Sequence, residues 1–152
     1  LQMFNNFIII ISNTARSVEY LKRLKLEKIH PKLIIHLDDR SNNNHYKFLI
    51  KKNYYFSGVK VKKFFETIIS KKVASFILNN KNKIIIFSGY PGVIIKNSLL
   101  LKKRFFLHSH PGKLPQFKGS TTIYYSLLKY KKIFCSTLIL NEKIDDGKVL
   151  FT

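Results

Sequence analysis

Three short segments of this chain carry the side chains that could do chemistry. His108 and His110 stand two residues apart at the end of an apolar run, and residues at that spacing on a strand point to the same side. A glycine-rich turn at residues 89–92 follows another apolar run, and residues 145–147 (Asp-Asp-Gly) form a turn between two more. Imidazoles and a carboxylate in one place predict acid–base chemistry or stabilisation of a developing oxyanion.

Short apolar runs alternate along the chain with segments whose apolar residues recur at helical spacing. These patterns predict the strands and helices that position these side chains. This alternation indicates an α/β fold with a mostly parallel central sheet. In such a sheet the carboxyl ends of the strands share one edge, where ligands bind. We expect strands at residues 7–12, 33–37, 84–88, 104–108, 134–140 and 148–151, helices at residues 16–26, 59–78, 93–101 and 119–130, and a polar loop at residues 40–45.

The composition is that of a globular protein. Its 152 residues are 45% hydrophobic and 14% aromatic, which argues against disorder and predicts a single domain over residues 1–152. Because the chain opens on Leu1 and the last predicted strand reaches its end, we expect trimming at one or both ends. A single cysteine excludes an internal disulfide, and we find no apolar run long enough for a membrane span and no signal peptide. We therefore expect a cytoplasmic protein without a membrane partner.

The net charge of +20 is the second distinctive property. It arises from 28 Lys and Arg residues against 8 Asp and Glu residues, and it favours anionic partners. The lysines are scattered or paired, however, and Lys, Asn, Ile, Phe and Tyr all have AT-rich codons. We therefore attribute much of the excess to genome composition and regard nucleic acid as a less favoured partner. An anionic small substrate is compatible with either explanation.

Three segments together resemble the folate-dependent formyltransferases. Residues 110–119 have the sequence HPGKLPQFKG, similar to a family loop whose usual form is Asn-x-His-Pro-Ser-Leu-Leu-Pro-x-x-x-Gly. Thr137 and residues 144–150 (IDDGKVL) resemble the signature Thr…Val-Asp-x-Gly-x-Ile-Ile, and residues 84–94 (IIIFSGYPGVI) resemble a strand and loop of the family. Because the order and spacing of all three fit, the likeness covers roughly residues 82–150.

The resemblance implies a Rossmann-like, three-layer domain that transfers a formyl group from 10-formyltetrahydrofolate to a primary amine. The family's catalytic residues are an asparagine, a histidine and an aspartate. His110 matches the histidine, Asp145 matches the aspartate, and His108 stands at the place of the asparagine. Two loops are implied to bind the pterin of the donor, one with Tyr90, Pro91, Gly92, Val93 and Ile94 and the other with Asn141, Glu142, Lys143, Ile144 and Asp146.

The acceptor is expected to be a small-molecule amine. After the first strand, residues 12–17 contain no glycine, whereas the glycinamide ribonucleotide branch of the family has a glycine-rich turn there for phosphate. The methionyl-tRNA branch carries a further C-terminal domain, which this chain does not include. These differences favour a sugar amine, with Gly119, Ser120 and Thr121 as candidate acceptor contacts, although helix capping and core packing explain the same residues.

Two other functions remain open. The family also contains a deformylase, so the chain could instead hydrolyse the formyl donor. A catalytically impaired formyltransferase fold could also serve as a binding module for an anionic partner, with an affinity that falls steeply with salt. A metal site built from His108, His110 and Asp145 has suitable ligand chemistry, but the resemblance favours formyl transfer and no metal is expected. The sequence does not predict an oligomeric state.

Several other residues are interpreted as structural. His36 is expected to be a surface histidine with satisfied hydrogen bonds, and Cys135 a packing residue buried in an apolar strand. Tyr124 and Tyr125 could stack on nucleic-acid bases, but packing in the core is the more common use of such residues.

Overall fold

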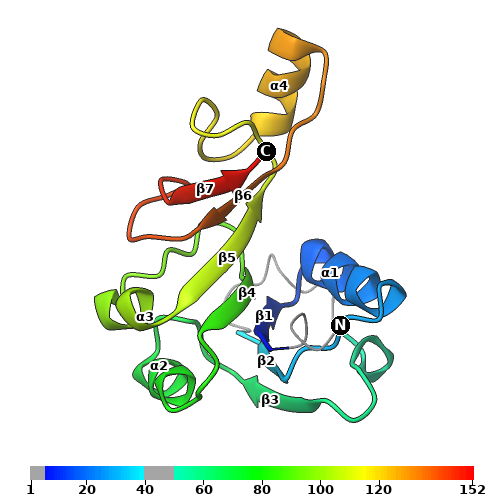
Figure 1. Ribbon diagram of the computed structural model, residues 1–152, viewed down its shortest axis with the longest axis vertical. Coiled ribbons are helices and arrows are strands. Elements are labelled where there is room, and N and C mark those ends of the chain that lie inside the picture. Colours follow the sequence, from blue (N-terminus) through cyan, green and yellow to red (C-terminus); the bar gives the residue numbers. More distant parts are fainter. Residues whose placement is uncertain (1–5, 40–49) are drawn as a thin grey trace. The chain divides into compact units, whose positions relative to one another are not determined.

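The computed structural model describes residues 6–39 and 50–152, so the polar loop predicted at residues 40–45 lies outside the described residues. The chain divides into two compact units, Leu1–Val93 and Ile94–Thr152. Figure 1 shows the elements, which follow in the order β1 (Ile8–Ser12), α1 (Ala15–Leu26), β2 (Leu33–Leu37), the 3-10 helix η3 (Lys52–Tyr54), β3 (Lys60–Phe64), α2 (Lys71–Leu78), β4 (Ile84–Ser88), α3 (Ser98–Lys103), β5 (Phe105–His110), α4 (Thr122–Tyr130), β6 (Ser136–Ile139) and β7 (Lys148–Phe151).

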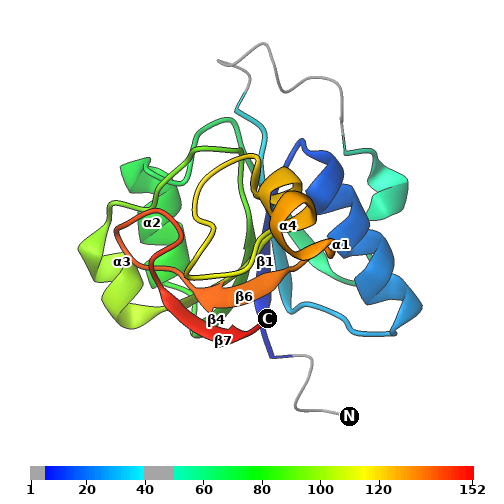
Figure 2. The same cartoon turned by 90° about the horizontal axis from the view of Figure 1, so that it is seen from above.

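The first unit is built on a parallel sheet with the strand order β3-β2-β1-β4. Its central strand β1 is an isoleucine run with every side chain fully buried, because a central strand of a parallel sheet is covered on both faces. Helices α1 and α2 lie on opposite sides of β1 (Figure 2). Because β1, β2 and β4 are parallel, their carboxyl ends lie along one edge of the unit.

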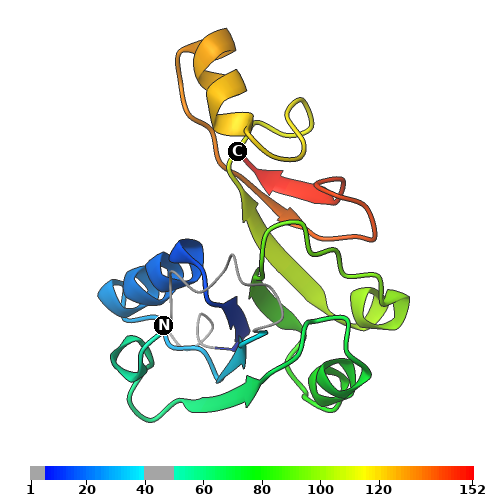
Figure 3. The same cartoon turned by 180° about the vertical axis from the view of Figure 1, so that it is seen from behind.

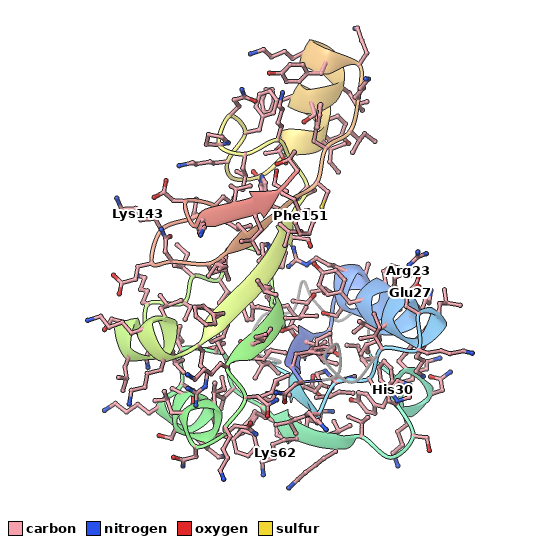
Figure 4. The ribbon with its side chains drawn as sticks, in the orientation of Figure 1. Arg23, Glu27, His30, Lys62, Lys143 and Phe151 are labelled. Carbon is pink, nitrogen blue, oxygen red and sulfur yellow. The ribbon has the colours of Figure 1, made fainter. Side chains whose placement is uncertain are left out.

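Helix α1 begins at a side-chain cap. Thr14 accepts a hydrogen bond from the N–H of Ser17 at 3.2 Å, and this bond satisfies one of the unpaired donors of the first helical turn. Near the other end of the helix, Arg23 and Glu27 pair at 2.7 Å on the exposed face, as Figure 4 shows. An exposed pair of this kind contributes little to stability.

The helix predicted over residues 59–78 is wrong. Its first part forms β3, which pairs in parallel with β2, and the helix α2 begins only after Ser70. Apolar residues such as Val61 recur there at helical spacing, but the strand gains a hydrogen-bonded ladder from a distant segment, which periodicity cannot report. Ser70 marks the start of the helix by accepting a hydrogen bond from the N–H of Val73 at 3.5 Å.

The second unit is built on an antiparallel sheet with the strand order β5-β6-β7 (Figures 1 and 3). Strand β5 runs on to His110, two residues beyond its predicted end, and His110 lies opposite Ser136 in the ladder between β5 and β6. Gly147 lies in the turn before β7. Glycine is required at this position because a Cβ would collide with the carbonyl oxygen of Ile139. Cys135 precedes β6 and is exposed, so the expectation that it is buried is wrong.

Helix α4 buries polar side chains and exposes apolar ones. Thr122 and Ser126 lie one helical turn apart and face inward, with exposed fractions of 2% and 0%. The helix starts three residues later than predicted, after Thr121, which forms no side-chain cap. Packing of Tyr124 and Tyr125 in the core is not observed, since both side chains are exposed. The exposed side carries Ile123, Tyr124, Tyr125, Leu127 and Leu128.

The predicted α/β class with a mostly parallel sheet is confirmed. The assignment of residues 1–152 to a single domain stays a prediction. Among the helices that the structure describes, none has the length and apolar character that a bilayer crossing requires.

Candidate active site

The candidate site is centred on His110, the last residue of β5, whose side chain is 3% exposed. Pro111 follows directly. Because proline offers no N–H to a ladder, the strand stops at this point and the chain turns away. The imidazole is therefore presented at the end of a strand, which is the position that the sequence predicts for it.

Both ring nitrogens of His110 face hydrogen-bond acceptors. Nδ1 lies 3.3 Å from Oδ2 of Asp145, and Nε2 lies 2.7 Å from the carbonyl oxygen of Phe117. A carbonyl oxygen and an ionised carboxylate can accept hydrogen bonds but cannot donate them. The ring therefore has an acceptor beside each of its nitrogens, and these two contacts fix its orientation.

The position of the Asp145 carboxylate is set by the conformation of its backbone and by a hydrogen bond from Gly119. Its φ of 47° lies in the left-handed region, and its Oδ2 accepts a hydrogen bond from the N–H of Gly119 at 2.8 Å. This bond fixes the position of the carboxylate beside the imidazole. The structure thus brings together three of the predicted site residues, His110, Asp145 and Gly119.

The predicted pterin loop at residues 141–146 is closed by its own polar groups. Asn141 donates through Nδ2 to the carbonyl oxygen of Asp146 at 3.0 Å and accepts from the N–H of Lys143 at 2.9 Å. The Asp146 carboxylate pairs with Lys118, whose hydrogen bond lowers the pKa of Asp146 from its ordinary value. Glu142, Lys143 and Ile144 are exposed, and Figure 4 shows Lys143 in the turn that precedes β7.

His108 lies half-buried on β5, opposite Leu138 of β6. Strand alternation places it on the same face of β5 as His110. Over residues 6–39 and 50–152, no group of three or more His, Cys, Asp and Glu side chains is placed to hold a metal ion.

The remaining predicted contacts lie in two separate segments. Ser120 and Thr121 are exposed, and Thr121 has a φ of 64°, a conformation that β-branched residues rarely adopt. The other predicted pterin loop begins in the first unit with Tyr90, which is 8% exposed; burial raises the pKa of its hydroxyl. Pro91 and Gly92 are exposed, Val93 is half-buried, and Ile94 opens the second unit.

Sequence reasoning missed three groups that surround His110. These are the carbonyl of Phe117, the hydroxyl of Thr122 and the hydroxyl of Ser136, all of which bond to His110 or to the turn after it. A carbonyl leaves no signature in a sequence. Ser136 does leave one, since it occupies an inward position of a strand whose other inward residue is Leu138, and a buried hydroxyl there needs a partner.

A second polar cluster occupies the first unit, and it corrects the interpretation of His36 as a surface residue. His36 is 1% exposed, with Nε2 2.9 Å from Oδ1 of Asn13 and Nδ1 2.6 Å from the hydroxyl oxygen of Tyr55. Asn13 donates to Asp38 at 2.6 Å, and Lys63 pairs with Asp38 at 2.6 Å. These polar groups satisfy one another, which is why His36 can be buried.

Comparison with known proteins gives matches among solved structures. No protein-family model and no curated protein sequence matches this chain. The phosphoribosylglycinamide formyltransferase from Anaplasma phagocytophilum superposes with a TM-score of 0.64 at 14% identity, over 96% of this chain and 69% of that one. A sugar N-formyltransferase from Shewanella sp. superposes with a TM-score of 0.58 at 19% identity, over 95% of this chain and 55% of that one.

A formyltetrahydrofolate deformylase from Pseudomonas putida KT2440 has the same fold as well. It superposes with a TM-score of 0.58 at 17% identity, over 95% of this chain and 51% of that one. The chain thus spans between half and about two thirds of the length of these three proteins. At such identities the likeness establishes the fold, and the predicted Rossmann-like architecture is confirmed.

Proposed function

We propose that this chain, whose fold is that of the formyltransferases, transfers a formyl group from 10-formyltetrahydrofolate to a primary amine. The observation that carries the proposal is the buried contact of 3.3 Å between His110 and Asp145. The two residues lie 35 positions apart in the sequence. They meet where the resemblance implies a catalytic pair.

The arrangement around His110 suits stabilisation of negative charge. When an amine attacks a formyl carbon, charge builds on the formyl oxygen, and an N–H aimed at that oxygen lowers the barrier by about 3 kcal/mol. The Nε2–H of His110 supplies such a donor once it is released from the carbonyl of Phe117. Asp145 acts through the ring, because its contact with Nδ1 orients the imidazole.

In the overall reaction, the amine nitrogen bonds to the formyl carbon, the bond from that carbon to the donor nitrogen breaks, and one amine proton ends on the donor nitrogen. When bound, 10-formyltetrahydrofolate would supply the activated formyl group. The 141–146 loop suits a hydrogen-bonding heterocycle, since Asn141 holds its backbone in a fixed turn while residues 142–144 stay exposed. The net charge of +20 suits the carboxylates of a folate.

A sugar amine is the acceptor that we propose. The loop after β1, where the glycinamide ribonucleotide branch holds phosphate, has its polar groups bound within the protein. Arg16 donates to the carbonyl oxygen of Gly89 at 2.9 Å, and Ser17 contacts the hydroxyl of Ser88 at 2.8 Å. Gly119 bonds to Asp145 through its N–H, and Gly119, Ser120 and Thr121 are proposed to contact the acceptor. His108 is proposed as an auxiliary donor.

Formyl transfer is tested by incubating the protein with 10-formyltetrahydrofolate and a panel of amino sugars. We expect a formylated product, and we expect His110→Ala to lower its rate by about 10²- to 10³-fold, since a donor to the oxyanion is lost. His30→Ala is the matched control, because His30 is an exposed histidine of the first unit. The absence of both turnover and folate binding in the wild-type protein would contradict the proposal.

A hydrolase is the second candidate, favoured by the similarity to the deformylase. The same assay without an amine distinguishes it, because hydrolysis releases formate when water is the only acceptor. A third result, salt-sensitive binding of nucleic acid that is indifferent to His110→Ala, would identify a binding module instead.

A further inference from the structure

Two buried hydroxyl groups hold the turn that follows His110. We define the 111–114 turn as residues Pro111 to Leu114. The hydroxyl of Thr122, at the start of α4, donates to the carbonyl oxygen of Pro111. The hydroxyl of Ser136, at the start of β6, donates to the carbonyl oxygen of Gly112 at 2.7 Å and accepts from the N–H of Leu114 at 3.0 Å.

Ser136 uses its full hydrogen-bonding capacity in this position. A serine hydroxyl has one hydrogen to donate and two lone pairs to accept with. Its hydrogen goes to Gly112, one lone pair takes the N–H of Leu114, and the other takes the hydroxyl of Thr152 at 2.8 Å. The side chain is completely buried. Water cannot replace these partners without rearrangement, so the turn has one well-defined position.

The position of the 111–114 turn determines the space available to the imidazole. A Cβ at Gly112 would lie 2.8 Å from Nε2 of His110 and 2.8 Å from Cβ of Thr122, so the backbone of the turn packs directly against the ring. The same turn leads to Phe117, whose N–H bonds to the carbonyl oxygen of Lys113 at 2.9 Å and whose own carbonyl accepts from the ring. Displacement of the turn would therefore move both groups that neighbour Nε2, the backbone of Gly112 and the carbonyl of Phe117.

We propose that Ser136, together with Thr122, is a positioning residue that fixes the imidazole of His110 through the 111–114 turn. Neither hydroxyl bonds to the ring itself. The catalytic consequence of this inference rests on the proposed formyl transfer, whereas the placement of the ring does not. The two parts can therefore be tested by separate measurements on the same variants.

Ser136→Ala and Ser126→Ala form a matched pair for the test. Both serines are fully buried in the second unit, but the hydroxyl of Ser126 has no hydrogen-bond partner in the part of the chain that the structure describes. The readout is the proton and nitrogen NMR resonances of the His110 ring in the full chain, assigned with His110→Gln. We expect Ser136→Ala to shift these resonances and Ser126→Ala to leave them at their wild-type positions.

Thr122 provides an independent pair if Ser136→Ala does not fold. Thr122→Val keeps the side-chain volume and removes the hydroxyl, whereas Thr122→Ser keeps the hydroxyl. We expect the valine variant to shift the His110 resonances and the serine variant to restore them. Unshifted resonances in a folded Ser136→Ala or Thr122→Val protein, or equal shifts in Ser126→Ala, would overturn the inference.

The activity measurement tests the consequence for catalysis. Misplacement of a reacting group by a supporting residue lowers rates by about 10- to 100-fold. We expect Ser136→Ala to lower kcat for formyl transfer by this factor with little change in KM, and Ser126→Ala to match the wild type. If the wild-type protein has no such activity, the proposed function fails while the NMR result still decides the role of Ser136. A change confined to KM would contradict a positioning role in catalysis.

Discussion

At the scale of single residues, the most informative feature is the pair of acceptors around the His110 ring. Asp145 on one side and the carbonyl of Phe117 on the other are both satisfied by a doubly protonated imidazole. A substrate oxygen that receives the Nε2–H must compete with the Phe117 carbonyl for it. In the proposed reaction, the Nε2–H would therefore exchange the Phe117 carbonyl for the substrate oxygen as its acceptor.

Gly112 yields a prediction at this scale, because its backbone packs against the ring. The related family loop commonly has serine at this position, but a Cβ here would lie 2.8 Å from His110 Nε2. We expect Gly112→Ala to lower the free energy of unfolding by about 1–3 kcal/mol through overpacking. Urea denaturation measures this change.

Gly92→Ala is the reference for that measurement. Nothing lies within 4 Å of a Cβ at Gly92, so alanine there carries only the strain of its φ of 77°. A Gly112→Ala protein as stable as the wild type would show that the turn moves away freely, which would also weaken the case for a fixed ring.

At the scale of elements, the edge of the first unit is held together by a chain of polar groups. Asn13 follows β1, His36 lies in β2, and Asp38 follows β2. Because Oδ1 of Asn13 can only accept, Nε2 of His36 carries the hydrogen and Nδ1 accepts from the hydroxyl of Tyr55. Burial lowers the pKa of His36 from 6.5 to about 4, with Lys63 adding to this effect and Asp38 opposing it.

This shift predicts how stability depends on pH. The unfolded chain protonates His36 near pH 6.5, whereas the folded protein resists protonation until about pH 4. The folded state therefore binds fewer protons in this window, and stability falls as the pH drops from about 6.5 to about 4. The loss attributable to His36 is about 3 kcal/mol.

Chemical denaturation at about pH 7 and about pH 4 checks this prediction. In His36→Gln the decrease in unfolding free energy between the two pH values should be about 3 kcal/mol smaller than in the wild type. His30→Gln, which alters an exposed histidine, should keep the wild-type pH dependence. An equal decrease in His36→Gln and wild type would show that His36 does not titrate in this way.

The sequence predicted most elements and failed where long-range contacts decide. The isoleucine run of β1 is a local signal, and the strand predicted from it is confirmed. The helix over residues 59–78 was wrong because β3 takes its hydrogen bonds from β2. For the site, local motifs located His110 and Asp145, but the contribution of Ser136 depends on a turn more than twenty residues away.

At the scale of the whole molecule, charge is the dominant property. The net charge of +20 is distributed over 28 basic residues with only 8 acidic ones to pair with them. Most basic side chains therefore repel one another, and this repulsion is greatest in the compact folded state.

Salt should consequently stabilise the folded protein. Raising NaCl from about 0.05 M to about 0.5 M shortens the screening length severalfold. We expect the unfolding free energy in urea, an uncharged denaturant, to rise by roughly 1 kcal/mol, the size of one unit-charge interaction at about 4 Å in water. A decrease with salt would indicate instead that the few ion pairs outweigh the general repulsion.

The exposed apolar side of α4 gives this charge a further consequence for the purified protein. Ile123, Tyr124, Tyr125, Leu127 and Leu128 face outward, and apolar surfaces of this kind adhere when two molecules meet. At low ionic strength, like-charge repulsion keeps the molecules apart. Added salt screens this repulsion between molecules while it stabilises the folded state of each one. High salt therefore favours folding stability, whereas low salt keeps the protein from aggregating.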